Sequence, residues 1–275
     1  MTRLSGSPRW RTRLMSPVFL YGDVRENFNT VSKPFVRASG GQRARIALLM
    51  LPRSEKYATR YREAWLKAGA GEVAPIYPPT NLTLTRDQLR TLKQSTGVFM
   101  SGGRTSLYQR AYGSKGVSSL LRELHDSGVP YGGVSAGAKM ACDYCTVGGT
   151  VVKTRTNEFP LASKEYVTSY QRQRPSERPG LVIRRGLGLV KNCVLQPHFT
   201  EFGLLPGLME AMSLTGSRYG IGVDEPICLE LRGETRATVR GRGRLYFFSR
   251  PGKRAEGSTF RLRVYEPGSH FELRG

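Results

Sequence analysis

Short apolar runs alternate with amphipathic stretches along the first half of the chain. Two stretches carry apolar side chains at helical spacing, residues 54–68 and a segment that begins at Thr85 and contains Leu89 and Leu92. They lie between continuous apolar runs of strand length, which are residues 17–21, 44–51, 73–77 and 97–100. Strands separated by single helices are typical of βαβ units. This half therefore predicts a doubly wound, mostly parallel sheet with helices on both faces.

The pattern changes after residue 150. Residues 171–185 combine five arginines with two prolines, and we expect a solvated loop there, with capture of an anionic substrate as the alternative. Strands are expected at 187–198 and 219–224. Short runs rich in Val, Phe, Tyr and Leu then follow one another without helices, at 227–231, 237–239, 245–248 and 260–265. The C-terminal end therefore predicts antiparallel strands.

The division into domains is expected to be simple. Residues 1–15 are rich in arginine and contain no acidic residue, so we expect a basic, disordered N-terminal arm. Residues 16–275 are expected to fold as a single α/β domain.

The chain is strongly basic. Its formal net charge is +22, and the Lys and Arg residues are spread over the whole length. This charge favours acidic partners, and nucleic acid, an anionic membrane surface and acidic small substrates all satisfy it. A polyanion- or nucleic-acid-binding protein therefore stands as one functional hypothesis.

The four cysteines are few and widely spaced. They favour a reducing compartment over a disulfide framework, so we expect a cytoplasmic protein. Cys142 and Cys145 have C-x-x-C spacing, but no second pair follows at zinc-ribbon spacing. They fall on a helix expected after residue 135, where ordinary packing explains them, and we expect neither a metal nor a cofactor. No apolar run is long enough to span a bilayer.

Ser135 stands between two glycines in the segment Gly133-Val134-Ser135-Ala136-Gly137. A serine at a sharp turn from strand to helix projects its hydroxyl clear of the backbone, and the small neighbours leave room for that turn. The helix that follows directs its free N–H groups towards charge that develops on a substrate. The segment therefore predicts a nucleophile elbow, with a Gly-rich packing turn as the simpler alternative.

A nucleophilic serine needs a base, and the chain has three histidines, His125, His198 and His270. His198 follows an apolar run and is expected at the carboxyl edge of the sheet, near Ser135. The N–H of Ala136 and that of Gly102 or Gly103 are the expected oxyanion donors. Spacing alone leaves the third member open among Asp143, Glu158, Glu165, Glu201, Asp224 and Glu225.

The chain resembles a family of serine peptidases that includes cyanophycinase and peptidase E, which is an aspartyl dipeptidase. This family is related to the class I glutamine amidotransferases. The resemblance covers roughly residues 40–250. The segments that carry it, in chain order, are Ala44-Arg45-Ile46-Ala47, Gly97-Val98-Phe99-Met100-Ser101-Gly102-Gly103, Gly133-Val134-Ser135-Ala136-Gly137-Ala138, Gln196-Pro197-His198-Phe199 and Gly220-Ile221-Gly222-Val223-Asp224-Glu225.

The resemblance implies cofactor-free hydrolysis of a peptide bond next to an acidic residue, either an N-terminal Asp or a β-aspartyl linkage. It implies a triad of Ser135, an acid and His198. Residues 154–160 resemble the peptidase E segment that carries the acid, which selects Glu158. Gly103 and Ala136 become the expected oxyanion donors, and the expected substrate contacts are Gly102, Arg104 and Asp224.

Two features depart from the family pattern. Cyanophycinases usually carry Asp-Gln after the glycine pair, where this chain has Arg104-Thr105. They also usually carry an Arg-rich helix after Gln-His-Phe, where this chain has Thr200-Glu201-Phe202. Arg104 suits a substrate carboxylate, although a surface arginine is ordinary in so basic a chain. The peptidase E and cyanophycinase subfamilies both stay open, as does a homodimer. The expected partner is an acidic peptide or isopeptide.

Overall fold

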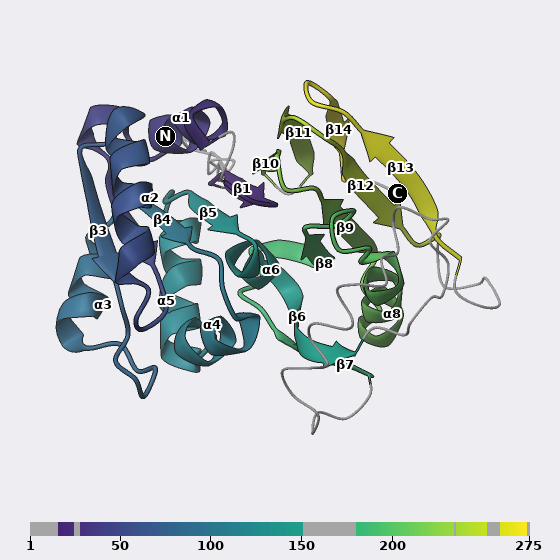
Figure 1. Cartoon of the computed structure of the whole chain (residues 1–275), viewed down its shortest axis with the longest axis horizontal. Helices are drawn as coiled ribbons and strands as arrows, with labels where there is room; N and C mark the ends of the chain where they lie inside the picture. The colour runs from purple at the N-terminus through teal and green to yellow at the C-terminus, as the bar shows by residue number, and fades with distance from the viewer. Residues whose placement is uncertain (1–15, 25–27, 151–179, 234, 252–258, 274–275) are drawn as a thin grey trace, which may run out of the picture.

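The computed structural model describes residues 16–24, 28–150, 180–233, 235–251 and 259–273. Within these residues, two β-sheets of eight and six strands lie side by side with helices packed around them (Figure 1).

Five parallel strands form one side of the eight-stranded sheet. In spatial order from one edge they are β3 (Glu72–Ile76), β2 (Arg45–Leu49), β4 (Gly97–Met100), β5 (Tyr131–Val134) and β1 (Val18–Tyr21). Three antiparallel strands continue the sheet beyond β1: β10 (Ile227–Arg232), β11 (Arg236–Gly241) and β14 (His270–Glu272). These five parallel strands are the part predicted from the alternation of strands and helices.

The six-stranded sheet has a parallel centre of three strands: β6 (Cys142–Thr150), β8 (Val190–Pro197) and β9 (Tyr219–Val223). Antiparallel strands flank it, namely β7 (Gly180–Arg185) beside β6, and β12 (Leu245–Ser249) followed by β13 (Arg261–Tyr265) beside β9. The two sheets meet where the chain passes from β9 directly into β10.

Both faces of β1, β4 and β5 are buried, which explains why these strands carry no charged residue. In β1, Val18 and Leu20 belong to one core, whereas Phe19 and Tyr21 belong to the core on the opposite face. The helices divide between these faces. The Phe19 face is covered by α1 (Phe28–Ala38) and α2 (Glu55–Lys67); the Val18 face is covered by α3 (Arg86–Lys93), α4 (Thr105–Tyr112), α5 (Lys115–Asp126) and α6 (Ala136–Ala141).

The core on the Phe19 face is aromatic. Trp65 of α2 packs on Phe99 of β4 with ring centroids 4.5 Å apart, and Phe35 of α1 lies 5.7 Å from the same ring. The second sheet is covered on one face by α8 (Leu205–Thr215), whose Leu208 and Met212 pack with apolar residues of β8 and β12. Helices on both faces of a mostly parallel sheet confirm the predicted fold class.

The structure also corrects three expectations. The predicted single sheet is divided into two, because β6, β8 and β9 pair with one another and not with β1 or β5. The helix after Ser135 ends at Ala141, so Cys142 and Cys145 lie on strand β6, where both thiols are free and buried. Part of the expected loop at 171–185 forms β7. The predicted N-terminal arm lies outside the described residues.

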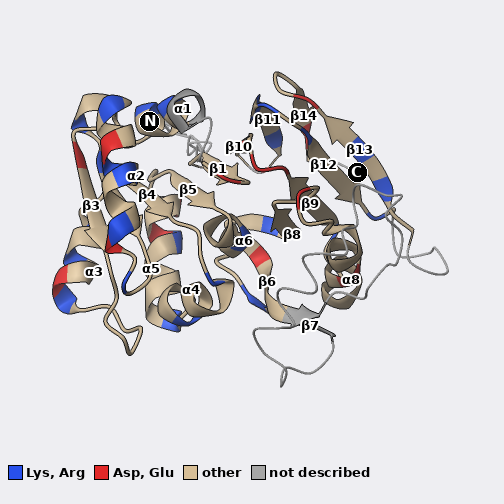
Figure 2. Cartoon of the chain, viewed as in Figure 1, with Lys and Arg blue, Asp and Glu red and all other residues tan. Residues whose placement is uncertain are grey.

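The basic residues are spread over the fold. Figure 2 shows Lys and Arg on α2, on α3 and on β13, with acidic residues among them. No described helix is both long enough and apolar enough to cross a membrane.

Candidate active site

Ser135 occupies a strained turn between β5 and α6. Its φ and ψ are 53° and −110°, and a positive φ costs free energy at any residue other than glycine. Its backbone N–H donates to the carbonyl of Tyr21, 3.1 Å away. A Cβ on Gly133 would lie 2.5 Å from the carbonyl carbon of Gly137. The turn therefore has the geometry of a nucleophile elbow, with its glycines required by close backbone approach.

Gly137→Ala is expected to destabilise the fold, because the added Cβ would lie 2.1 Å from the Met100 carbonyl oxygen. Such overpacking costs about 1–3 kcal/mol, occasionally more. Thermal unfolding measures the effect. Gly116→Ala in α5 is the matched control, since no atom lies within 4 Å of its added Cβ. That control is expected to gain about 0.5–1 kcal/mol. A Gly137→Ala variant as stable as the wild type would contradict the packing argument.

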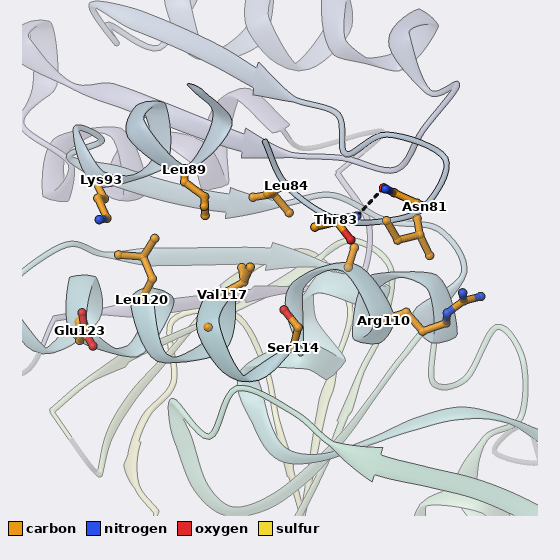
Figure 3. Close-up of a pocket in the computed structure, with 13 residues that line it drawn as sticks. Asn81, Thr83, Leu84, Leu89, Lys93, Arg110, Ser114, Val117, Leu120 and Glu123 are labelled. Atoms are coloured by element: carbon orange, nitrogen blue, oxygen red, sulfur yellow. Dashed lines mark hydrogen bonds between the residues drawn. The ribbon is translucent and has the colours of Figure 1, made fainter. Parts of the chain in front are cut away.

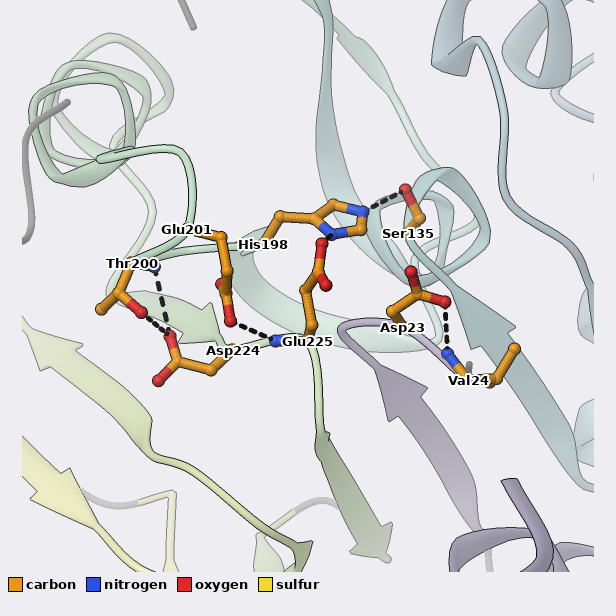
Figure 4. A network of polar contacts seen from close by, with 8 residues as sticks. All are labelled: Asp23, Val24, Ser135, His198, Thr200, Glu201, Asp224 and Glu225. Atoms are coloured by element: carbon orange, nitrogen blue, oxygen red, sulfur yellow. Dashed lines mark hydrogen bonds and ion pairs between the residues drawn. The ribbon is translucent and has the colours of Figure 1, made fainter. Parts of the chain in front are cut away.

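His198 meets Ser135 from the other sheet. It follows the last residue of β8, and its Nε2 lies 2.9 Å from the Ser135 Oγ (Figure 4). Its side chain is largely buried, and burial lowers the pKa of the imidazole, although the Glu225 carboxylate opposes that shift. The ring is therefore predominantly neutral at neutral pH, and one ring nitrogen keeps a lone pair.

Glu225 lies on the opposite side of the imidazole ring. Its Oε1 is 2.8 Å from His198 Nδ1. The sheet explains this proximity. Strands β8 and β9 are parallel neighbours, with Pro197 paired to Val223, so the residues that follow them emerge at the same edge. The chain then turns into β10, and the N–H of Asp23 donates to the Glu225 carbonyl at 2.7 Å. Glu225, at the junction of the two sheets, is thus linked to Ser135 through His198.

The other predicted histidines and carboxylates lie elsewhere or outside the described residues. His125 is buried in α5, and His270 on β14 contacts Thr238. Glu158, the predicted third member, lies outside the described residues, as does Glu165. The carboxylate that contacts His198 is Glu225, one of the alternatives left open by spacing.

Asp224 was predicted as a substrate contact, and in the structure its carboxylate accepts hydrogen bonds from two neighbouring turns. Its Oδ1 accepts bonds from the N–H and the hydroxyl of Thr200, at 3.1 and 2.8 Å, and its Oδ2 accepts from the N–H of Arg244 at 3.3 Å. Nearby, Glu201 Oε1 accepts from the N–H of Glu225 at 3.0 Å. These bonds tie the turn after His198 to the turn after β9, so Asp224 holds the two turns together.

The glycine pair after β4 also lies beside the elbow. A Cβ on Gly102 would lie 3.2 Å from the Ser135 Cβ, whereas one on Gly103 would meet Leu51 and Tyr108. The Tyr108 hydroxyl bonds the Ser101 Oγ at 2.5 Å and the Gly102 carbonyl at 3.2 Å. The Tyr108 hydroxyl thus holds the Gly102–Gly103 loop, which lies next to Ser135 as predicted.

Two charged residues near the elbow were missed from the sequence. Lys139 lies four residues after Ser135 in α6, and its positive charge acts on His198, whose pKa it helps to lower. Its side chain is partly buried, and burial lowers the pKa of its ammonium to about 8. Arg104, in contrast, is exposed at the start of α4. The four-residue spacing was visible in the sequence as a signal for Lys139.

Asp23 is the second missed residue. It follows β1, whose end pairs with that of β5, so Asp23 and Ser135 emerge at the same edge. One ligand atom each from Asp23, His198 and Glu225 lies within 4.8 Å of the others, and these are the described side chains that could hold a metal ion together. Only the strand order reveals this proximity, because 175 residues or more separate Asp23 from the other two.

A pocket of about 490 Å³ lies apart from these residues, between α3, α4 and α5 (Figure 3). Leu84, Leu89, Val117 and Leu120 form its apolar lining. It shares no lining residue with the site around Ser135.

An α/β fold in which a strained serine contacts an imidazole, and the imidazole a carboxylate, defines the class of serine-hydrolase-like proteins. Within that class, the chain belongs to peptidase family S51, whose model matches residues 22–239. The resemblance to the peptidase E and cyanophycinase family is thereby confirmed.

Two relatives of known name agree with this membership. The chain is 25% identical over 189 residues to a cyanophycinase of Synechococcus elongatus, covering 68% of this chain and 52% of that protein. It therefore spans about half the length of that relative. A cyanophycinase of Geminocystis herdmanii is 23% identical over 238 residues, which is 84% of this chain and 79% of the relative.

Two solved structures share the fold. A peptidase from an acI-B1 Actinobacterium superimposes with a TM-score of 0.63 at 17% identity, covering 95% of this chain and 98% of the other. A putative peptidase E of Listeria monocytogenes EGD-e gives a TM-score of 0.52 at 16% identity, covering 83% and 100%. At these identities the likeness concerns the fold.

Proposed function

We propose that the protein is a serine peptidase that cleaves a peptide bond next to an acidic residue, with Ser135, His198 and Glu225 as its triad. The observation that carries the proposal is the continuous hydrogen-bonded line from Ser135 Oγ to His198 Nε2 (2.9 Å) and from His198 Nδ1 to Glu225 (2.8 Å). Glu225 takes the place predicted for Glu158.

In the proposed reaction, His198 Nε2 accepts the Ser135 proton while Oγ attacks the scissile carbonyl. Glu225 keeps the remaining imidazole proton on Nδ1 and stabilises the imidazolium. The N–H of Ala136, at the start of α6, and the N–H groups of the Gly102–Gly103 loop bind the oxyanion. His198 then protonates the leaving amine, and water attacks the acyl-enzyme with His198 as base.

Preference for an acidic residue rests on Lys139. No carboxylate within the described part of the chain forms an ion pair with this partly buried ammonium. A substrate carboxylate beside Lys139 would stabilise the charged ammonium, which burial destabilises. The acidic substrates of peptidase E and cyanophycinase make an Asp or β-aspartyl residue the first choice. Cytoplasmic location, a homodimer and binding of nucleic acid stay predictions.

A fluorophosphonate probe tests the proposal directly. The probe is expected to label Ser135, as located by mass spectrometry, and a panel of Asp-X, β-Asp-X and Asn-X dipeptides is expected to be cleaved in favour of the acidic members. A serine that the probe does not modify, together with salt-sensitive binding of DNA or RNA, would support the polyanion-binding alternative instead.

Lys139→Met is expected to lower kcat/KM for Asp-X about 10- to 100-fold and to leave Asn-X little changed, because a charge-assisted hydrogen bond contributes about 1.5–3 kcal/mol. The preference of the wild type for Asp-X should also decline above about pH 8, where the ammonium loses its proton. The ratio of kcat/KM values for the two dipeptides measures both effects.

Lys191→Met is the matched control. Lys191 lies on β8, and its exposed side chain pairs with Asp143 at 3.8 Å. The ratio should not change in this variant. If Lys139→Met lowered kcat/KM equally for Asp-X and Asn-X, Lys139 would have no role in selecting acidic substrates.

A further inference from the structure

Three side chains at the junction of the two sheets form a group suited to a metal ion. Asp23, His198 and Glu225 follow the ends of β1, β8 and β9, and one ligand atom from each lies within 4.8 Å of the other two (Figure 4). All three are partly buried. The backbone bond from Asp23 to the Glu225 carbonyl, at 2.7 Å, holds the two acidic residues in register.

We infer that this group binds a divalent transition metal, zinc by preference, and that the bound metal reversibly inhibits the enzyme. One imidazole and two carboxylates are a donor set that zinc favours, with bonds of about 2.0–2.2 Å. Ligand atoms around tetrahedral zinc lie roughly 3.4 Å apart. Small rotations of two carboxylates on loops bring atoms from 4.8 Å or less to that separation.

Inhibition follows from the tautomer of His198, and this part of the inference rests on the proposed function. For hydrolysis, the proton lies on Nδ1 and the lone pair of Nε2 faces Ser135. Glu225 faces Nδ1, so a metal bound between them takes the lone pair of Nδ1. The single imidazole proton then moves to Nε2. The ring becomes a donor to Ser135 and loses the lone pair that accepts the serine proton.

Asp23 separates metal binding from hydrolysis, because the proposed reaction gives it no step. Asp23→Asn keeps an oxygen for the Val24 N–H and removes the charge. Asp143→Asn is the matched control, since Asp143 on β6 pairs with Lys191 and bonds the N–H of Asn192.

The first experiment measures binding without catalysis. Ser135→Ala retains all three ligands, and calorimetric titration with zinc chloride should give one site. Adding Asp23→Asn to that variant should weaken binding about 10- to 100-fold, and adding Asp143→Asn should not change it. No heat of binding, or equal dissociation constants in all three proteins, would overturn the inference.

The second experiment measures inhibition. Zinc should reduce dipeptide hydrolysis by the wild type, and a chelator should restore the rate. The zinc concentration that halves the rate should be about tenfold higher or more in Asp23→Asn than in the wild type, with each protein compared with its own rate without zinc. An active enzyme that zinc leaves unaffected would overturn the inference alone. Zinc binding to a protein that no serine probe modifies would overturn the proposed function alone.

Discussion

Ser135→Ala is expected to lower kcat for Asp-X dipeptides by about 10⁴-fold or more, since removing the nucleophile of a serine triad removes the covalent route altogether. The residual rate would come from the oxyanion donors and from substrate binding. Steady-state kinetics of purified protein measures the loss, and labelling by a fluorophosphonate probe should disappear with it.

Two further variants make this result specific. Ser127→Ala removes an exposed hydroxyl at the end of α5 that bonds the Leu124 carbonyl, and it should keep full activity and labelling. Ser135→Gly should be as inactive as Ser135→Ala while relieving the positive φ, so an inactive Ser135→Gly that melts at or above the wild-type temperature excludes unfolding as the cause. Wild-type rates in Ser135→Ala would end the proposed mechanism.

Glu225→Gln is the second large effect. A glutamine beside Nδ1 can donate its amide hydrogen to that nitrogen, which stabilises the tautomer with the proton on Nε2. The base then lacks its lone pair, and kcat should fall about 10³- to 10⁴-fold. Loss of rate with unchanged thermal stability would mark a chemical effect.

Glu158→Gln provides the matched comparison, because Glu158 is the carboxylate that the family resemblance selects. If Glu225 orients the imidazole, Glu158→Gln should retain a rate within a few-fold of the wild type. The opposite pair of results, an active Glu225→Gln and an inactive Glu158→Gln, would return Glu158 to the triad and remove Glu225 from it.

The parallel part of the fold could be predicted because its signal is local. Parallel strands such as β1 and β4 are short apolar runs, and helix α3 begins at a recognisable residue, Thr85, which forms a capping box with Gln88. The division into two sheets could not be predicted, because it depends on which strands pair across long distances in the sequence. Strand β6 follows α6 at once, yet it pairs with β8, which begins 40 residues after β6 ends.

The site shows the same limit. Ser135 and His198 could be found because a nucleophile elbow is a local motif and the chain has only three histidines. Glu225 was one of six candidates, and only the pairing of β8 with β9 places it beside the imidazole. Asp23 carries no local signal, since its position depends on the pairing of β1 with β5.

The 2.9 Å contact between Ser135 and His198 joins residues held by different sheets. The rate of the enzyme therefore depends on how accurately one sheet is docked against the other. A shift of about 1 Å between them is enough to break a hydrogen bond of that length. Substitutions in the apolar core that both sheets share, such as at Leu195 or Met140, are therefore expected to change kcat although they alter no reacting residue.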